Sequence, residues 1–130
     1  MKNLFIVLIL LGFFSSCSKD DDPRILSDLI GRWVWVESTG GIDGRTETPI
    51  ATGNQITIVF TSEFYKKYVN DTLDVQMTYK LKIGESFRLT ENTNLLIYED
   101  GWKQSMELCD NKLILYDECL DCFVNEYIKE

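Results

Sequence analysis

Most of the chain after residue 30 alternates between apolar and polar side chains. The clearest stretch is Leu73–Ile83, in which every odd-numbered residue is apolar and every even-numbered residue is polar. Successive side chains of a β-strand point to opposite faces, so this period of two predicts a strand with one buried face.

Seven further segments share this pattern and are separated by turn residues. They are Arg32–Glu37, Gln55–Thr61, Phe64–Val69, Leu95–Tyr98, Trp102–Leu108, Leu113–Tyr116 and Phe123–Lys129. Asn70 with Asp71, and Asp100 with Gly101, are residue pairs that adopt the backbone angles of tight hairpin turns. The chain is therefore predicted to run through consecutive antiparallel hairpins.

Eight short strands joined mostly by tight turns predict an all-β fold. We expect an eight-stranded antiparallel up-and-down barrel, because closing the sheet removes its exposed edges; a two-sheet sandwich is the alternative. A short N-terminal helical turn, Ile25–Ile30, is expected to end at Gly31 and to cap the fold. The glycine-rich segment Ser38–Asn54 is too long for a hairpin turn and is expected to cover the mouth of the barrel.

The first residues have the pattern of an export signal. Lys2 gives a positive start, Leu4–Phe14 is apolar, and Ser15 and Ser16 lead to Cys17. The apolar run is shorter than the roughly 20 residues that cross a bilayer, and it resembles a bacterial lipobox. We expect residues 1–16 to be a signal peptide and Cys17 to carry diacylglycerol and palmitate. The alternative is an ordinary secretory signal with an incidental cysteine.

Residues 17–24 are charged and contain a proline, so we interpret them as a solvated, lipidated tether. Residues 25–130 then form the barrel domain. The lipid would hold this domain on the outer membrane, and the two alternatives for its location are the cell surface and the periplasmic face. Lys19 followed by acidic residues looks like a surface-export signal, which favours the cell surface.

Composition restricts the function. There are 13 basic and 21 acidic residues, a net charge of -8 and no histidine. The negative charge opposes binding to nucleic acid, and the absence of histidine removes the commonest general base and metal ligand. No spacing of carboxylates or nucleophiles aligns a catalytic site, so we expect no enzyme activity and no cofactor.

Cys109, Cys119 and Cys122 remain after Cys17, and three cysteines allow three disulfide pairings. A bridge from Cys109 would have to cross the length of the strand Leu113–Tyr116, whereas Cys119 and Cys122 share one turn, so their pairing is favoured. Redox, zinc and calcium chemistry are weaker interpretations, because acidic neighbours suppress thiolate formation and no EF-hand spacing is present. We expect no metal site.

The tryptophans Trp33, Trp35 and Trp102 lie on predicted strands. Exposed on a surface lipoprotein, they would suit the binding of glycans. On strands that alternate, however, aromatic side chains more often belong to the core. We predict that all three are core residues.

A short helix running into Gly31, Arg32 and Trp33 resembles the Gly-x-Trp signature that opens lipocalin barrels. The first loop, with Gly40, Gly41, Ile42, Gly44, Thr48 and Pro49, is similar to that of the lipocalin-like lipoproteins of gut-type anaerobes. The resemblance implies a lipocalin-like barrel in which Lys129, near the end of the last strand, packs over Trp33.

The same resemblance implies a cup that holds a small apolar ligand. The candidate lining residues are the inward positions of two strands, namely Ile56, Ile58, Phe60, Val75, Met77, Tyr79 and Leu81. Eight strands enclose only enough space for side chains or one small ligand. The alternative is therefore a filled barrel that binds a protein or glycan partner through its exterior.

Overall fold

The structure is a computed structural model that describes residues 24–89 and 92–130. The expected signal peptide, Cys17 and residues 18–23 of the expected tether lie outside the described residues. Among the described residues, no helix has the length and apolar character needed to cross a membrane.

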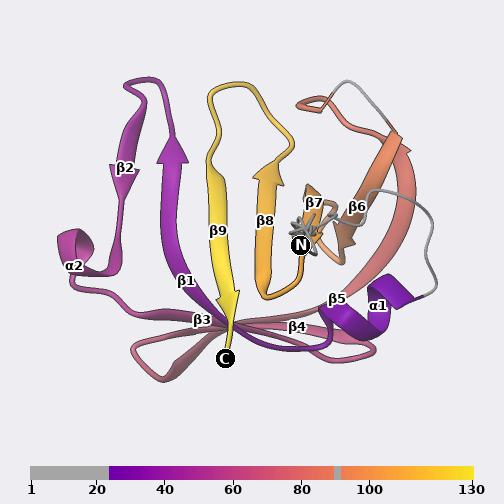
Figure 1. Ribbon diagram of the computed structural model, residues 1–130, viewed down its shortest axis with the longest axis horizontal. Helices are drawn as coiled ribbons and strands as arrows, with labels where there is room; N and C mark the ends of the chain where they lie inside the picture. The colour runs from indigo at the N-terminus through magenta and orange to yellow at the C-terminus, as the bar shows by residue number, and fades with distance from the viewer. Residues whose placement is uncertain (1–23, 90–91) are drawn as a thin grey trace, which may run out of the picture.

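Nine strands and two short helices make up the described part of the chain (Figure 1). In chain order they are α1 (Arg24–Leu29), β1 (Gly31–Gly40), β2 (Arg45–Glu47), α2 (Pro49–Thr52), β3 (Ile56–Phe60), β4 (Phe64–Val69), β5 (Thr72–Glu85), β6 (Asn92–Tyr98), β7 (Lys103–Cys109), β8 (Lys112–Asp117) and β9 (Val124–Lys129).

The strands form one closed antiparallel sheet. From β3 to β9 each strand pairs with the next in the chain, and β1 pairs with both β3 and β9, which closes the circuit. Since β2 pairs only with the end of β1, eight of the nine strands form the barrel. This confirms the predicted all-β up-and-down barrel with a short N-terminal helix and makes the two-sheet sandwich wrong.

The segment Ser38–Asn54 is more regular than predicted. Ser38–Gly40 continues β1 beyond the expected end, and β2 folds back to pair with these residues. The hydroxyl of Thr48 then accepts a hydrogen bond from the amide of Ala51, and Pro49 occupies the first turn of α2. A capping threonine followed by proline is a helix-start signal, so α2 could have been predicted from the sequence.

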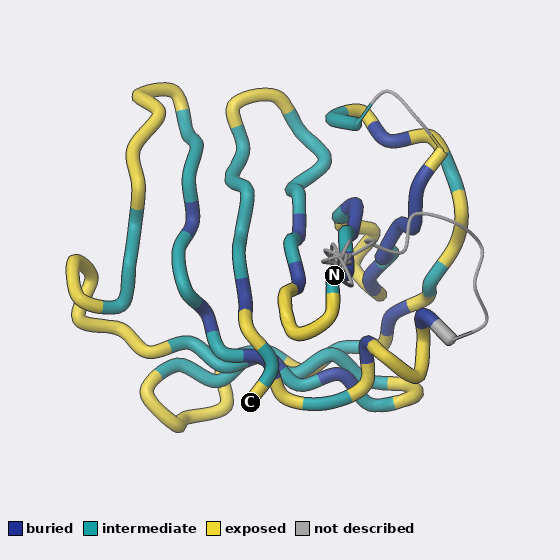
Figure 2. The backbone as a smooth tube through the Cα atoms, viewed as in Figure 1, coloured by how far each residue is buried: buried dark blue, intermediate teal, exposed yellow. Residues whose placement is uncertain are grey.

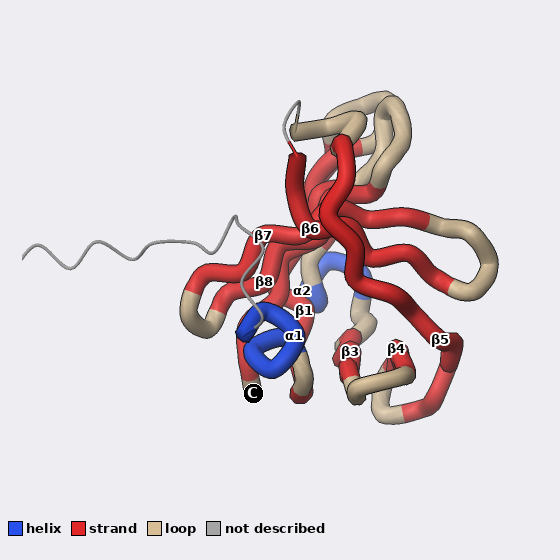
Figure 3. The backbone as a smooth tube through the Cα atoms, turned by 90° about the vertical axis from the view of Figure 1, so that its right-hand side faces the viewer, coloured by secondary structure: helices blue, strands red, loops and turns tan. Residues whose placement is uncertain are grey.

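One end of the barrel is filled by apolar side chains. Trp33 is completely buried there, together with Ile58, Phe60, Leu96, Leu113 and Leu115 from the strands and Ile25 and Leu29 from α1. Figure 2 shows exposed residues at most of the turns and buried residues on the strands and α1. In the side view of Figure 3, α1 lies beside the C-terminal end of the chain, where it covers this closed end.

Gly31, Trp33 and Lys129 meet at the closed end. The indole nitrogen of Trp33 donates a hydrogen bond to the carbonyl of Leu29 at 2.8 Å. The ammonium of Lys129 lies 5.2 Å from the centre of the Trp33 ring and donates to the carbonyl of Asp28 at 3.1 Å. A side chain at Gly31 would press on Lys129, since a Cβ there would lie 3.2 Å from Cε. These contacts join α1 to the first strand, β1, and to the last strand, β9.

We predict that Trp33→Ala lowers the free energy of unfolding by about 3–5 kcal/mol, because it leaves a large cavity in the filled end. Trp102→Ala is the matched control: Trp102 is 43% exposed, and its loss should cost less than about 1 kcal/mol. Urea unfolding followed by circular dichroism measures both. Equal losses would contradict the assignment of Trp33 as the main residue of the closed end.

Candidate functional site

The other end of the barrel contains a cavity of about 420 Å³. Its walls are inward-facing residues of the barrel strands, joined by Glu47 of β2 and Thr52 of α2. Thus β2 and α2 stand at the mouth, where the sequence predicted a covering loop. We call this cavity the cup.

Aromatic rings form much of the cup wall. They belong to Trp35, Tyr65, Tyr98, Trp102, Phe123 and Tyr127. The rings of Tyr65 and Tyr98 lie 5.0 Å apart, and Tyr65 also contacts Phe60 of the filled end, with ring centres 5.4 Å apart. A continuous aromatic contact therefore connects the floor of the cup with the core.

A half-buried carboxylate, that of Asp117, lies on one wall of the cup. Its Oδ1 accepts a hydrogen bond from the side-chain amide of Gln104 at 2.7 Å and another from Asn125 at 3.2 Å. Gln104 also accepts a hydrogen bond from the hydroxyl of Tyr98 at 2.5 Å. Gln104 and Asp117 are direct partners across β7 and β8, so the sheet register fixes the carboxylate and its donor.

The hydrogen bonds continue onto β1. The hydroxyl of Ser38 donates to Oδ1 of Asn125 at 2.7 Å and accepts from the indole nitrogen of Trp35 at 2.9 Å. Ser38 and Asn125 are paired residues of β1 and β9. One connected chain of polar side chains thus runs from Tyr98 to Trp35 across five neighbouring strands, and we call it the polar row.

Burial raises the pKa of the Asp117 carboxyl, while the hydrogen bonds from Gln104 and Asn125 partly offset that effect. Burial also raises the pKa of Tyr65, Tyr98 and Tyr127, and the negative charge of Asp117 raises each of them further. The electrostatic effect of this carboxylate therefore extends to three of the rings that line the cup.

The connection between β8 and β9 forms part of the rim and is fastened in two ways. Cys119 and Cys122 form the disulfide favoured by the sequence, with their Cα atoms 5.5 Å apart. Arg88, which follows β5, donates to the carbonyls of both cysteines, at 3.4 and 3.1 Å. Gly40, at the end of β1, lies so close that an added Cβ would be 2.4 Å from the carbonyl oxygen of Cys122.

A second set of contacts holds the segment after β5 against this rim. Glu118 accepts hydrogen bonds from the hydroxyl of Ser86 and the amide of Phe87, each at 2.6 Å. Although burial opposes the charge of Glu118, hydrogen bonds from Ser105, Ser86 and the backbone lower its pKa. The acidic turn is therefore built into the structure rather than simply solvated.

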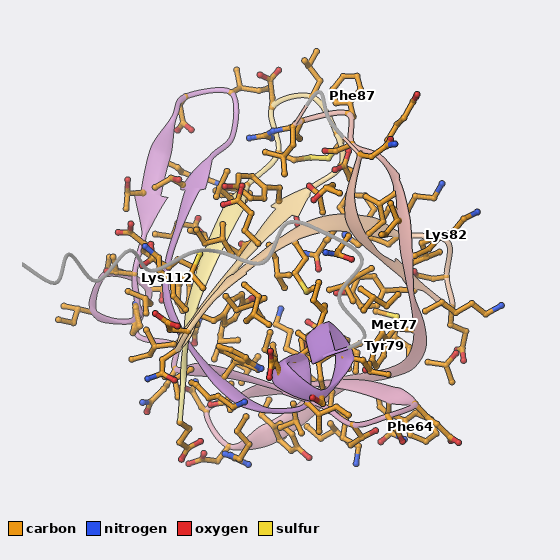
Figure 4. All side chains as sticks on the ribbon, turned by 45° about the vertical axis from the view of Figure 1, so that its right-hand side comes forward. Phe64, Met77, Tyr79, Lys82, Phe87 and Lys112 are labelled. Atoms are coloured by element: carbon orange, nitrogen blue, oxygen red, sulfur yellow. A yellow bond between two sulfur atoms is a disulfide. The ribbon has the colours of Figure 1, made fainter. Side chains whose placement is uncertain are left out.

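The structure divides the candidate lining residues into two groups. Ile56, Val75 and Met77 line the cup. The other four, Ile58, Phe60, Tyr79 and Leu81, do not line it; the first three are buried in the core and Leu81 packs against it. In Figure 4, Met77 lies on the inner side of β5 and Lys82 on the outer side. Alternation identifies the inward face but not the depth of a residue within the barrel.

The prediction that all three tryptophans are core residues is wrong for Trp102. Trp33 and Trp35 are buried, at 0% and 4% exposure, but Trp102 is 43% exposed and lies at the cup wall. Trp102 comes just before β7, after the turn at Asp100 and Gly101. At the end of a strand no further sheet covers the ring, so it contributes to the mouth.

Sequence reasoning missed the polar side of the cup. Leu113 and Leu115 are inward core residues, and the same period of two places Asp117 inside, one residue beyond the predicted end of the strand at Tyr116. Lys67 is likewise an inward residue, two positions after Tyr65. Continuing the alternation through polar residues would have found both.

Within residues 24–89 and 92–130, no group of three or more Cys, Asp or Glu side chains is arranged to hold a metal ion. No family model, curated protein or solved structure matches the chain. The lipocalin resemblance therefore stays a prediction, and the closed barrel and its cup are the basis for assigning function.

We predict that Asp117→Asn raises the free energy of unfolding at neutral pH. The raised pKa means that the folded state disfavours the charged carboxyl, so this group stabilises the fold only as pH falls through its folded pKa towards its unfolded value. Asparagine removes the penalty and keeps an oxygen to accept from Gln104 and Asn125. The advantage of the variant should shrink as the wild-type carboxyl becomes protonated.

Thermal unfolding at about pH 7 and about pH 4 measures this difference. Asp110→Asn is the control, because it makes the same charge change in an exposed turn at the other end of β8. A stability gain that is independent of pH, or one that Asp110→Asn reproduces, would show that burial of Asp117 is not its cause.

Proposed function

We propose that this protein is a lipid-anchored binding protein that holds one small, largely apolar ligand in the cup. The observation that carries this proposal is the cavity of about 420 Å³ inside the barrel. Small-molecule sites in proteins commonly have volumes of about 300–1,000 Å³ and combine apolar walls with a few placed polar groups.

The walls of the cup support a ligand with an apolar body. Ile56, Val75 and Met77 provide aliphatic surface in addition to the aromatic rings, and the polar row provides hydrogen-bonding groups. The filled end gives the cup a rigid floor, since it packs as a core. A cup with such a floor can bind without the protein rearranging, which lowers the entropic cost of association.

The proposed location of the protein in the cell rests on the sequence. The apolar run that ends in Cys17 supports export followed by lipid attachment, and the charged residues after it support a tether between the membrane and the barrel. The protein would then be an outer-membrane lipoprotein on the cell surface or the periplasmic face, and it would meet ligands that never enter the cytoplasm.

Lipid attachment gives a direct prediction. Cells that express the full chain and are fed an alkyne analogue of palmitate should label the wild-type protein, and Cys17→Ala should abolish the label because the acceptor sulfur is gone. Ser16→Ala is the control, since alanine preserves a small residue before the cysteine. Equal labelling of Cys17→Ala and the wild type would contradict the proposed attachment of lipid to Cys17.

Ligand binding is tested by native mass spectrometry of the protein purified from its own cells. The wild type should retain a small molecule, and Val75→Trp should lose it, because the indole would occupy the cup. Gln76→Trp is the matched control, because Gln76 is the next residue of β5 and is exposed. Retention by Val75→Trp equal to that of the wild type would place the molecule elsewhere.

A second candidate function, binding a protein or glycan partner through the exterior, is favoured by two exposed isoleucines. Ile42 is 93% exposed and Ile50 is 97% exposed, and both belong to the segment Ser38–Asn54 at the mouth. If repeated preparations of the wild type retain no small molecule, this second function replaces the first.

A further inference from the structure

Asp117 has no counter-ion in the described part of the chain. The ion pairs there involve Arg32, Arg45 and Lys112, and none of them includes Asp117. The hydrogen bonds to its carboxylate come from neutral groups, namely the side-chain amides of Gln104 and Asn125 and the backbone of Phe123. A cation near a half-buried carboxylate offsets part of its lost hydration, which neutral dipoles replace only in part.

The nearby cations do not fill this role. Lys67 lines the cup from β4, which is four strands from β8 in either direction around the eight-stranded circuit. It therefore lies on the opposite wall. The charge of Arg88 lowers the pKa of Asp117 less than the hydrogen bonds to the carboxylate do, and its Nη1 donates to the carbonyls of Cys119 and Cys122. The carboxylate thus faces the cup without a matching charge from the protein.

The aromatic rings around Asp117 are suited to a positive charge. Tyr65, Tyr98 and Tyr127 line the same cup as Asp117, and its negative charge raises the pKa of each. Trp35 is connected to Asp117 through the polar row. A cation near ring faces gains roughly 0.5–2 kcal/mol, and most when water is excluded. The same rings would gain nothing of this kind from an anion.

The other charges of the protein also favour a cationic ligand over an anionic one. The cup wall holds two carboxylates, Glu47 and Asp117, and one ammonium, Lys67. Glu47 is paired with Arg45 at 3.3 Å, so Asp117 is the carboxylate of the cup wall without an ion pair in the described part of the chain. The whole chain carries a net charge of -8. A field of this sign raises the local concentration of cations at the mouth and repels anions.

We propose that the ligand of the cup is an organic cation, an amine or quaternary ammonium attached to an apolar body, with Asp117 as its counter-ion. This inference rests on the proposed function and names its ligand class. The ammonium lies between the carboxylate and the rings, and the apolar body contacts Ile56, Val75 and Met77.

The test uses three probes of one shape and different charge: phenethylamine, 2-phenylethanol and 3-phenylpropanoate. Binding to the barrel of the full chain is followed by tryptophan fluorescence, since Trp35 and Trp102 both line the cup. The ammonium should bind about tenfold more tightly than the alcohol, and the carboxylate most weakly, as expected for one charge-assisted contact and one ring contact.

Four variants assign the effect to Asp117. Asp117→Asn should weaken the binding of phenethylamine by about tenfold and leave the binding of 2-phenylethanol nearly unchanged. Asp117→Glu should restore part of the preference for the amine over the alcohol. Asp110→Asn changes the net charge equally but lies in an exposed turn outside the cup, so it should change neither probe by more than about twofold. Lys67→Gln should strengthen the binding of phenethylamine, because it removes a positive charge from the cup wall.

The outcomes separate the ligand class from the binding function. Equal binding of ammonium and alcohol, with no effect of Asp117→Asn, overturns the cationic class and leaves the cup as a site for neutral ligands. The cationic class is also overturned if 3-phenylpropanoate binds most tightly of the three probes and Lys67→Gln abolishes that binding. If no probe binds, the molecule retained in native mass spectrometry decides: a basic nitrogen supports the inference, its absence overturns it, and no retained molecule overturns both proposals.

Discussion

The pairing of β1 with β9 is the contact on which the rest of the structure depends. It joins the first and last strands, whose paired residues lie about 90 positions apart in the chain, and it turns an open sheet into a closed barrel. The same pairing brings Lys129 over Trp33 at one end and Asn125 beside Ser38 at the other. Without this pairing neither the plugged end nor the polar row would exist.

The barrel divides its interior between a filled end and an open cup. At the closed end, large apolar side chains from α1 and the strands fill the space, and Lys129 covers Trp33. Towards the mouth, serine, asparagine, glutamine and aspartate replace aliphatic residues at inward positions, which leaves space and polar groups. The cost of placing Asp117 there is the kind of local penalty that proteins tolerate at sites that bind something.

The fold could be predicted because alternation fixes which face of each strand is buried, as in Leu73–Ile83, and because turn pairs fix where strands reverse. The site could be predicted only in part. Ile56, Val75 and Met77 line the cup, but their inward neighbours Ile58 and Phe60 lie in the core, since depth depends on the tilt of the strands and on α1. Alternation continued past Tyr116 would have placed Asp117 inside, but its contacts with Gln104 and Asn125 could not be predicted, because these residues lie on other strands.

Gly40 has a consequence for how the mouth can be altered. Its backbone lies against the carbonyl of Cys122, so the β1–β2 hairpin and the disulfide turn are in contact with no side chain between them and together form a lip of the mouth. Gly44, four residues further along the same hairpin, has open space around it. A peptide graft or fluorescent label placed at Gly44 would therefore project from the lip, whereas the same insertion at Gly40 would separate its two halves.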